Sequence, residues 1–143
     1  MSWSRERDAE DDWARLYTSA KNVQNARTVS DWVEAGGVAA AVLAKSGAVY
    51  TGICIDTACS LGMCAERNAI AHMLTCGESE IQKLAVIMPD GRMGLPCGAC
   101  CEFMLQLGDR AGEIEILMDY QKRETRRLKE VFPNWWGRKS DSQ

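Results

Sequence analysis

Cys64-Ala65-Glu66-Arg67 is the stretch of sequence that decides the fold, and Pro96-Cys97-Gly98-Ala99-Cys100 follows it later in the chain. Together the two stretches supply three thiols and one carboxylate that is not needed as a ligand. A structural zinc site is closed by four protein ligands, whereas a catalytic site has three and leaves the fourth position for water. The spacing therefore predicts a catalytic Zn²⁺ site with Cys64, Cys97 and Cys100 as ligands and Glu66 beside the water.

Each stretch is predicted to lie at the beginning of a helix. Small and apolar residues that follow Cys64 and end before Gly77 predict the first helix. Pro96 suits the first turn of a second helix, and Gly108 suits its C-terminal end. Helix N-termini lower thiol pKa values through their unpaired N–H groups and positive dipole ends. We expect Arg67, beside the first ligand, to hydrogen-bond the thiolates and to offset their negative charge.

Two other interpretations of the cysteines stay open. Cys97-Gly98-Ala99-Cys100 alone is typical of a thioredoxin-like dithiol, although a thiol redox protein has no need of the upstream Cys64-Ala65-Glu66. A catalytically silent protein with structural zinc would recruit Cys59 or Cys101 as the fourth ligand. Cys101 is adjacent to Cys100, so on a helix its side chain points about 100° away from that ligand.

The composition bounds the class of protein. With 143 residues, 46% of them hydrophobic, the chain is expected to form a single domain over residues 1–143. No apolar run approaches the roughly 18 residues of a membrane span, and Ser4-Arg5-Glu6-Arg7-Asp8 is too charged for a secretory signal. A formal net charge of −3 argues against a nucleic-acid partner. We expect a cytoplasmic protein with no membrane partner, whose seven cysteines serve as metal ligands or thiols rather than as disulfides.

Hydrophobic periodicity predicts the remaining elements. Apolar residues at three- and four-residue intervals predict a helix over residues 8–33. Strands over residues 38–43 and 49–52 flank a turn at Lys45-Ser46-Gly47. Further strands over residues 83–88 and 113–118 flank the second zinc helix in β–α–β order, and a charged amphipathic helix is predicted over residues 124–132.

The ligand stretches and the hairpin resemble those of the cytidine deaminase family, specifically its small homo-oligomeric branch that binds zinc through three cysteines. The related blasticidin S deaminases are similar. The resemblance covers about residues 36–136 and includes Leu128-Lys129-Glu130-Val131-Phe132-Pro133, which is similar to the family's C-terminal Glu-Leu-Leu-Pro. It implies a three-layer α/β/α sandwich with a mixed β-sheet, a homotetramer, and hydrolytic deamination of a free aminopyrimidine nucleoside. Trp135 and Trp136 are candidate residues of the subunit interface.

The resemblance also implies a role for each matching residue. Cys64, Cys97 and Cys100 would bind zinc, and Glu66 would act as the general acid and base rather than as a ligand. Main-chain groups of Ala65 and Pro96 would hold the edge of the pyrimidine.

The chain departs from the family where the sugar binds. Family members carry an asparagine and a glutamate, two residues apart, that bind the ribose, and the corresponding residues here are Cys54 and Asp56. Aspartate keeps an acceptor, but cysteine cannot replace the paired donor and acceptor of an amide. A phenylalanine that packs on the base corresponds to Gly36. We therefore expect ordinary cytidine to be a poor substrate, and a modified analogue such as a blasticidin-like cytosine nucleoside to be preferred.

Overall fold

The computed structural model describes residues 2–137, with side chains described from residue 12 onward. In chain order the elements are α1 (Ser2–Val23), β1 (Arg27–Thr28), β2 (Val33–Ala44), β3 (Val49–Thr57), α2 (Ala65–Thr75), β4 (Ile81–Ile87), α3 (Gly98–Leu105), the 3-10 helix η1 (Ala111–Glu113), β5 (Glu115–Asp119), β6 (Glu124–Arg127) and α4 (Leu128–Val131). Within this part of the chain, none of the helices combines the length and the apolar character that a bilayer span requires.

Strand β2 organises the sheet because three other strands pair with it. β3 pairs antiparallel along the whole of one edge. β4 pairs antiparallel with residues 39–44 on the other edge, and β1 pairs with residues 34–35 beyond it. β4 pairs parallel with β5, and α3 lies between these two strands in the chain. β5 pairs antiparallel with β6. The sheet is therefore mixed, and the predicted β–α–β order around the second zinc helix is confirmed.

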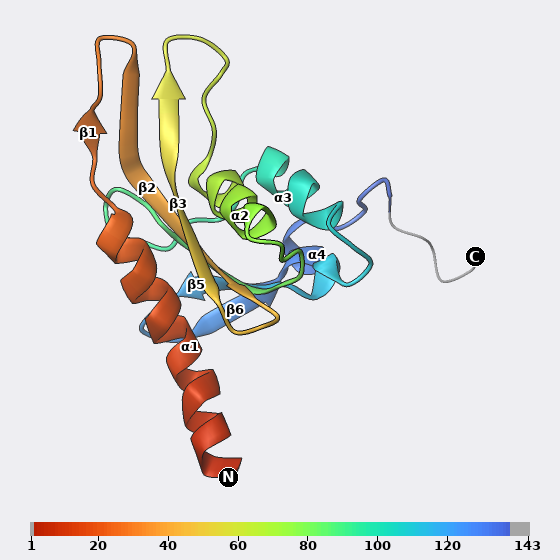
Figure 1. The fold of residues 1–143 in the computed structure, drawn as a ribbon. Coiled ribbons are helices and arrows are strands. Elements are labelled where there is room, and N and C mark those ends of the chain that lie inside the picture. The colour runs from red at the N-terminus through yellow and green to blue at the C-terminus, as the bar shows by residue number, and fades with distance from the viewer. Residues whose placement is uncertain (1, 138–143) are drawn as a thin grey trace.

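Helices cover both faces of this sheet, as Figure 1 shows. On one face, Trp13, Leu16 and Ala20 of α1 pack against β2 and β4. On the other face, α2, α3 and α4 enclose the larger core, which includes Ile70 and Met104. The expected three-layer α/β/α sandwich with a mixed β-sheet is therefore confirmed.

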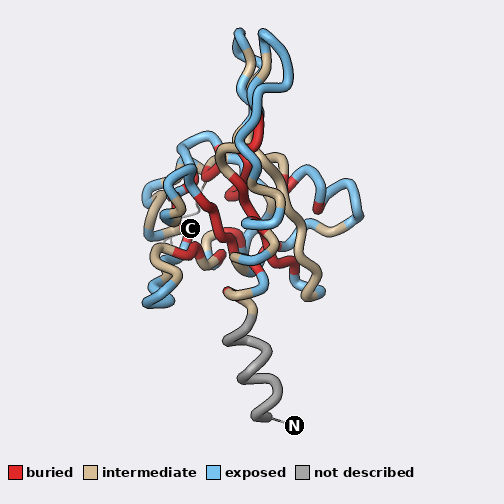
Figure 2. Tube along the Cα trace, turned by 90° about the vertical axis from the view of Figure 1, so that its left-hand side faces the viewer, coloured by how far each residue is buried: buried red, intermediate tan, exposed pale blue. Residues whose placement is uncertain are grey.

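An exposed arm rises above this body in Figure 2. It consists of residues 27–35 and 55–62, that is, β1, the adjoining ends of β2 and β3, and the loops that follow them. Trp32 is 72% exposed and Leu61 is 79% exposed. The Ala58 N–H donates to the Trp32 carbonyl over 3.0 Å, which ties the two loops of the arm together.

The helix predicted over residues 8–33 is wrong at both ends, because α1 covers Ser2–Val23. Past Val23 the Gln24 side chain donates to the carbonyl oxygens of Gly37 and Met88, each over 3.0 Å. Arg27–Thr28 then pairs with β2. The apolar stripe that predicted the helix ends at Val23, and beyond it pairing with the open edge of β2 outweighs local helix propensity.

The helix predicted over residues 124–132 is also wrong in its first half. Glu124–Arg127 is strand β6, and only Leu128–Val131 is helical. β6 gains ladder hydrogen bonds to β5, with Arg127 opposite Glu115. A charged segment beside an unpaired strand edge can satisfy its backbone in this way, which its side-chain pattern does not reveal. The two predicted hairpin strands are confirmed, and both are longer than predicted.

Candidate metal centre

Two helix N-termini position the predicted ligands. Cys64 caps α2 and Cys97 caps α3, both with extended backbone, at φ −68°, ψ 152° and φ −69°, ψ 169°. Each lies one residue before its helix, so both ligand stretches lie at the beginning of a helix, as predicted. The unpaired N–H groups and the positive dipole ends of both helices therefore face the same cluster of thiols.

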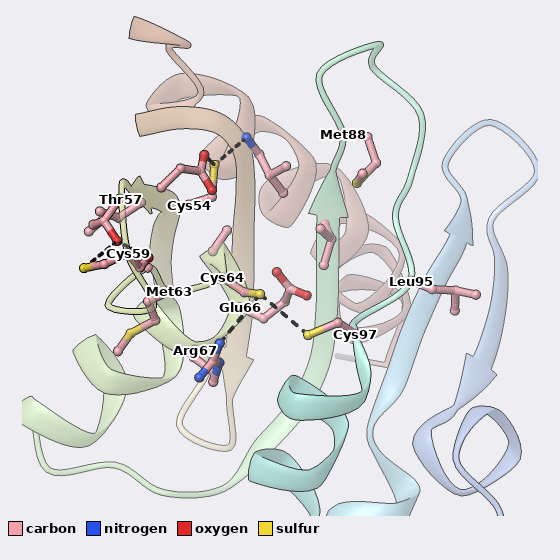
Figure 3. A pocket seen from close by; sticks show the side chains of 16 residues that line it. Cys54, Thr57, Cys59, Met63, Cys64, Glu66, Arg67, Met88, Leu95 and Cys97 are labelled. Atoms are coloured by element: carbon pink, nitrogen blue, oxygen red, sulfur yellow. Dashed lines mark hydrogen bonds between the residues drawn. The ribbon is translucent and has the colours of Figure 1, made fainter. Parts of the chain in front are cut away.

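The three predicted ligand thiols lie together. The Cys97 Sγ is 3.6 Å from the Cys64 Sγ and 3.5 Å from the Cys100 Sγ, and Figure 3 shows the first of these contacts. All three sulfur atoms lie within 4.8 Å of one another. Thiolates on a tetrahedral zinc with Zn–S bonds of about 2.3 Å are about 3.8 Å apart. The cluster is able to hold a metal ion, and its geometry and all-sulfur chemistry fit zinc.

The surroundings of the thiols favour their binding as a set to a cation. Burial raises the pKa of the Cys64 and Cys100 thiols. Burial also acts on Cys97, but hydrogen bonds from the Cys100 backbone and from the neighbouring thiols outweigh it and lower the pKa of Cys97. The Arg67 Nη2 lies 3.8 Å from the Cys64 Sγ, and this hydrogen bond raises the pKa of the guanidinium. Deprotonation of all three thiols therefore depends on a bound divalent cation.

Glu66 is the only buried charged residue among those whose burial is described, and it is 4% exposed. It lies in the first turn of α2, two residues after the ligand Cys64. Figure 3 shows its carboxylate between Cys64 and Cys97, pointing into the cavity. A buried carboxylate beside three thiols needs a compensating positive charge. A divalent cation in the cluster supplies that charge.

Strand β3 packs directly on α2 because Gly52 has no side chain. A Cβ at Gly52 would lie 2.3 Å from the Ala69 backbone nitrogen and 2.6 Å from the Ala65 carbonyl oxygen. The Asn68 Nδ2 also donates to the Ile53 carbonyl over 2.7 Å. These contacts hold the first turn of α2 against the strand whose following residues form one wall of the site.

A cavity of about 440 Å³ opens in front of the metal centre. Seven of the predicted site residues line it: Cys54, Asp56, Cys64, Ala65, Glu66, Arg67 and Cys97. Cys100 is buried and does not line the cavity. Pro96 does not line it either, and its carbonyl oxygen lies 3.6 Å from the Cys101 Sγ, which donates to it. The main-chain role of Pro96 stays a prediction.

The apolar part of the cavity was missed by the sequence reasoning. Met63, Met88 and Leu95 line it, on two opposite sides in Figure 3. A signal was present, because Met63 directly precedes Cys64 and Leu95 directly precedes the second ligand stretch. A residue next to a metal ligand in the chain is a candidate for the wall of the same site.

The departure from the family at Gly36 has a structural basis. Gly36 adopts φ +87°, and a Cβ there would lie 2.1 Å from the Asn25 carbonyl oxygen, so no side chain fits at this position.

Trp135 and Trp136 each donate an indole N–H to Glu102 over 2.7 Å, which ties the C-terminal segment to α3. Their predicted place in a subunit interface stays a prediction.

No fourth thiol joins the cluster within residues 12–137. Cys101 is 3% exposed, its Sγ faces the Pro96 carbonyl, and burial raises its pKa to about 11. The exposed Cys59 has its Sγ 3.8 Å from the Thr57 Oγ1. All seven cysteines are free thiols. Three thiols with one open position fit a catalytic zinc site better than a closed structural one.

Comparisons with known proteins agree with this geometry. The family described as "Cytidine and deoxycytidylate deaminase zinc-binding region" matches residues 14–115. A cytidine deaminase of Mycobacterium tuberculosis is 31% identical over 101 residues, which is 70% of this chain and 72% of the relative. A cytidine deaminase of Halalkalibacterium halodurans is 39% identical over 72 residues, 49% of this chain and 54% of the relative.

Solved structures agree in fold. The crystal structure of cytidine deaminase from Mycobacterium tuberculosis superposes with a TM-score of 0.72 at 28% identity, over 89% of this chain and 98% of that one. Cytidine deaminase from Burkholderia pseudomallei superposes with a TM-score of 0.66 at 26% identity, over 85% and 96% of the two chains. The thiol cluster, the mixed sheet and these matches agree, and the chain therefore belongs to the family of zinc-dependent cytidine and deoxycytidylate deaminases.

Proposed function

We propose that the protein removes the amino group from a free aminopyrimidine nucleoside by hydrolysis. The candidates are cytidine, deoxycytidine and modified cytosine nucleosides, including blasticidin-like ones. One observation carries the proposal, namely the buried Glu66 carboxylate that faces the cavity beside the thiols of Cys64, Cys97 and Cys100. A structural zinc site gives no reason to bury a carboxylate next to three thiols.

The chain's own residues account for the proton transfers. Zinc held by the three cysteines supplies a Lewis acid that lowers the pKa of a water to about 7. Glu66 accepts a proton from the attacking water and delivers it to the ring nitrogen next to the amino-bearing carbon. It then passes a second proton to the amino group, which leaves as ammonia while the carbon becomes a carbonyl. A buried carboxylate within hydrogen-bond reach of the substrate is suited to both transfers.

Other residues of the cavity tune the metal centre or position the substrate. Arg67 offsets part of the thiolate charge through its contact with Cys64, which keeps the metal a strong Lewis acid. The backbone of Ala65, which lines the cavity, holds one edge of the pyrimidine. The Pro96 carbonyl accepts from Cys101 and keeps a second lone pair for the amino group of the substrate.

Two further properties belong to this proposal. The exposed apolar tips of the arm, Trp32 and Leu61, and the 76% exposed Trp136 support assembly into a homotetramer. Sedimentation of the purified protein measures the mass of the assembly, and a monomer would contradict this part. We also place the protein in the cytoplasm, because its thiol ligands need a reducing compartment.

The test combines metal content with ammonia release. The purified full chain is expected to hold one zinc per chain and to release ammonia from at least one member of a panel of cytidine, deoxycytidine and blasticidin-like nucleosides. Removal of zinc with a chelator should abolish the release, and added zinc should restore it. Zinc binding without any ammonia release would support a silent zinc protein, and reversible disulfide formation between Cys97 and Cys100 would support a redox protein.

A further inference from the structure

Exposed apolar side chains gather at the cavity. Ten large hydrophobic side chains are exposed among the residues whose burial is described. Four of these ten line this one cavity: Ile55, Met63, Met88 and Leu95. Single exposed apolar residues are ordinary, whereas a gathering of them in a concave site marks a binding surface. The part of the cavity outside the metal centre therefore favours an apolar group.

The polar side chains of the same wall are largely occupied within the protein. Outside the metal centre, the polar side chains that line the cavity are Cys54, Asp56, Thr57 and Cys59. The Thr57 Oγ1 donates to the Cys59 carbonyl over 2.7 Å. The Cys54 Sγ accepts the Val38 N–H over 3.2 Å and lies 3.9 Å from the Asp56 Oδ2. Hydrogen bonds inside the wall thus use the O–H donor of Thr57 and the S–H donor of Cys54, which a sugar would otherwise contact.

Asp56 is the one charged group that this wall offers to a ligand among the described residues. An ionised carboxylate accepts hydrogen bonds and donates none. Arg67, the only cationic side chain among the described residues that line the cavity, donates through Nη2 to Cys64, so it serves the metal end of the cavity. A ligand hydroxyl that does not reach Asp56 would therefore lose its water against apolar side chains without a full replacement. Each such loss weakens binding by about five- to a hundredfold.

We propose that the cavity selects an aminopyrimidine whose substituent is mainly apolar and hydrogen-bonds to Asp56, in preference to one that carries a fully hydroxylated sugar. Cys54 and Leu95 are the specificity-determining residues, since one removes a sugar contact and the other supplies apolar surface. The inference rests on the proposed deaminase function and names its substrate class.

The test is a series of nucleosides with one base and a decreasing number of hydroxyl groups: cytidine, 2′-deoxycytidine and 2′,3′-dideoxycytidine. With the zinc-loaded full chain, we expect kcat/KM to rise along this series, by at least about tenfold from the first to the last, mainly through KM. A kcat/KM for cytidine equal to or above that for dideoxycytidine overturns the inference and leaves the deaminase function standing. Failure of the zinc-loaded protein to release ammonia from these three and from the blasticidin-like nucleosides counts against the proposed function itself.

Three variants and one control test these residues. Leu95→Asn should lower kcat/KM for dideoxycytidine more than for cytidine, and so reduce the preference for dideoxycytidine over cytidine. Leu74→Asn is the matched control, because Leu74 is 39% exposed on α2 and does not line the cavity. Cys54→Asn restores an amide and should raise kcat/KM for cytidine by about tenfold with little change for dideoxycytidine. Asp56→Asn should lower kcat/KM for dideoxycytidine but not for 1-methylcytosine, which has no hydroxyl group.

These variants also show whether the apolar wall binds a ligand or a second copy of the chain. If Leu95→Asn changes the sedimenting mass and leaves the nucleoside preference intact, the apolar side chains serve contacts between copies and the inference is overturned. Zinc content and circular dichroism establish that each variant is folded. The expected result is an unchanged mass with an altered preference.

Discussion

The two ends of the cavity are built by different means. At the metal end, Cys64 and Cys97 cap two helices, and backbone geometry brings their sulfur atoms to 3.6 Å from each other. At the opposite wall, β3 contributes side chains such as Cys54 and Asp56, whose hydrogen bonds lie within the wall itself. The thiol cluster thus sits on helix ends, whereas the residues proposed to choose the substrate lie on β3 and, for Leu95, on the loop before α3. A substitution at the metal end should lower the activity toward every substrate. A substitution at the opposite wall should change the activity toward some substrates more than toward others.

The largest effect is expected at a ligand. Cys97→Ser removes one of three thiols and should lose most of the bound zinc, with activity toward all substrates lost in parallel, because a hydroxyl is a far weaker zinc ligand than a thiolate. Elemental analysis and ammonia release measure the two losses. Cys76→Ser is the matched control at an exposed cysteine outside the cluster. Full zinc occupancy in Cys97→Ser would contradict the ligand assignment.

Glu66→Gln tests the metal end without removing a ligand. The variant should keep its fold and its zinc and lose at least about a hundredfold in kcat, because an amide cannot accept the proton. All substrates should slow by the same factor, which distinguishes this position from the β3 wall. Glu102→Gln is the parallel control at the nearest acidic residue on α3, and turnover by Glu66→Gln close to that of the unmodified protein would disprove the assignment.

The contact between β3 and α2 joins the two ends of the cavity. Gly52→Ala would place a methyl group 2.3 Å from the Ala69 backbone nitrogen, so the strand and the helix must separate. We expect the free energy of unfolding to fall by about 3 kcal/mol, the upper range for overpacking. Denaturant titration measures it. Gly108→Ala has no atom within 4 Å of the added carbon and serves as the control, and equal stability of the two variants would show that the contact is adaptable.

The smallest effect concerns the anchoring of α3, and it depends on pH. Hydrogen bonds from Gln106, Trp135 and Trp136 lower the pKa of Glu102 below its ordinary value of 4.5. Because the folded pKa is the lower one, this contribution to stability is present above pH 4.5 and is lost as the pH falls through the folded pKa. Tryptophan fluorescence should change over that acidic range. Glu102→Gln should lack this change, and an identical acid titration of both proteins would contradict the prediction.

Much of the site was predictable from the sequence because its chemistry is local. Cys64 and Glu66 are two residues apart, and Cys97 and Cys100 are one helical turn apart, so their types and spacing predicted the thiol cluster and the helix starts. The positions with an unusual backbone were not predictable. Gly36, for example, looks like the loss of an aromatic residue, but its φ of +87° and its approach to Asn25 show that the fold admits no side chain there.

The sequence by itself determined the thiol cluster, the candidate acid and base, and the α/β class, because these follow from residue types, their spacing and the hydrophobic period. Only the tertiary structure decided where α1 ends, that residues 124–127 pair as a strand, and that Met88 and Leu95 line the cavity with Cys54. Those outcomes depend on which strand edge is free and which distant segments meet. Such contacts leave no periodic trace in the segments that make them.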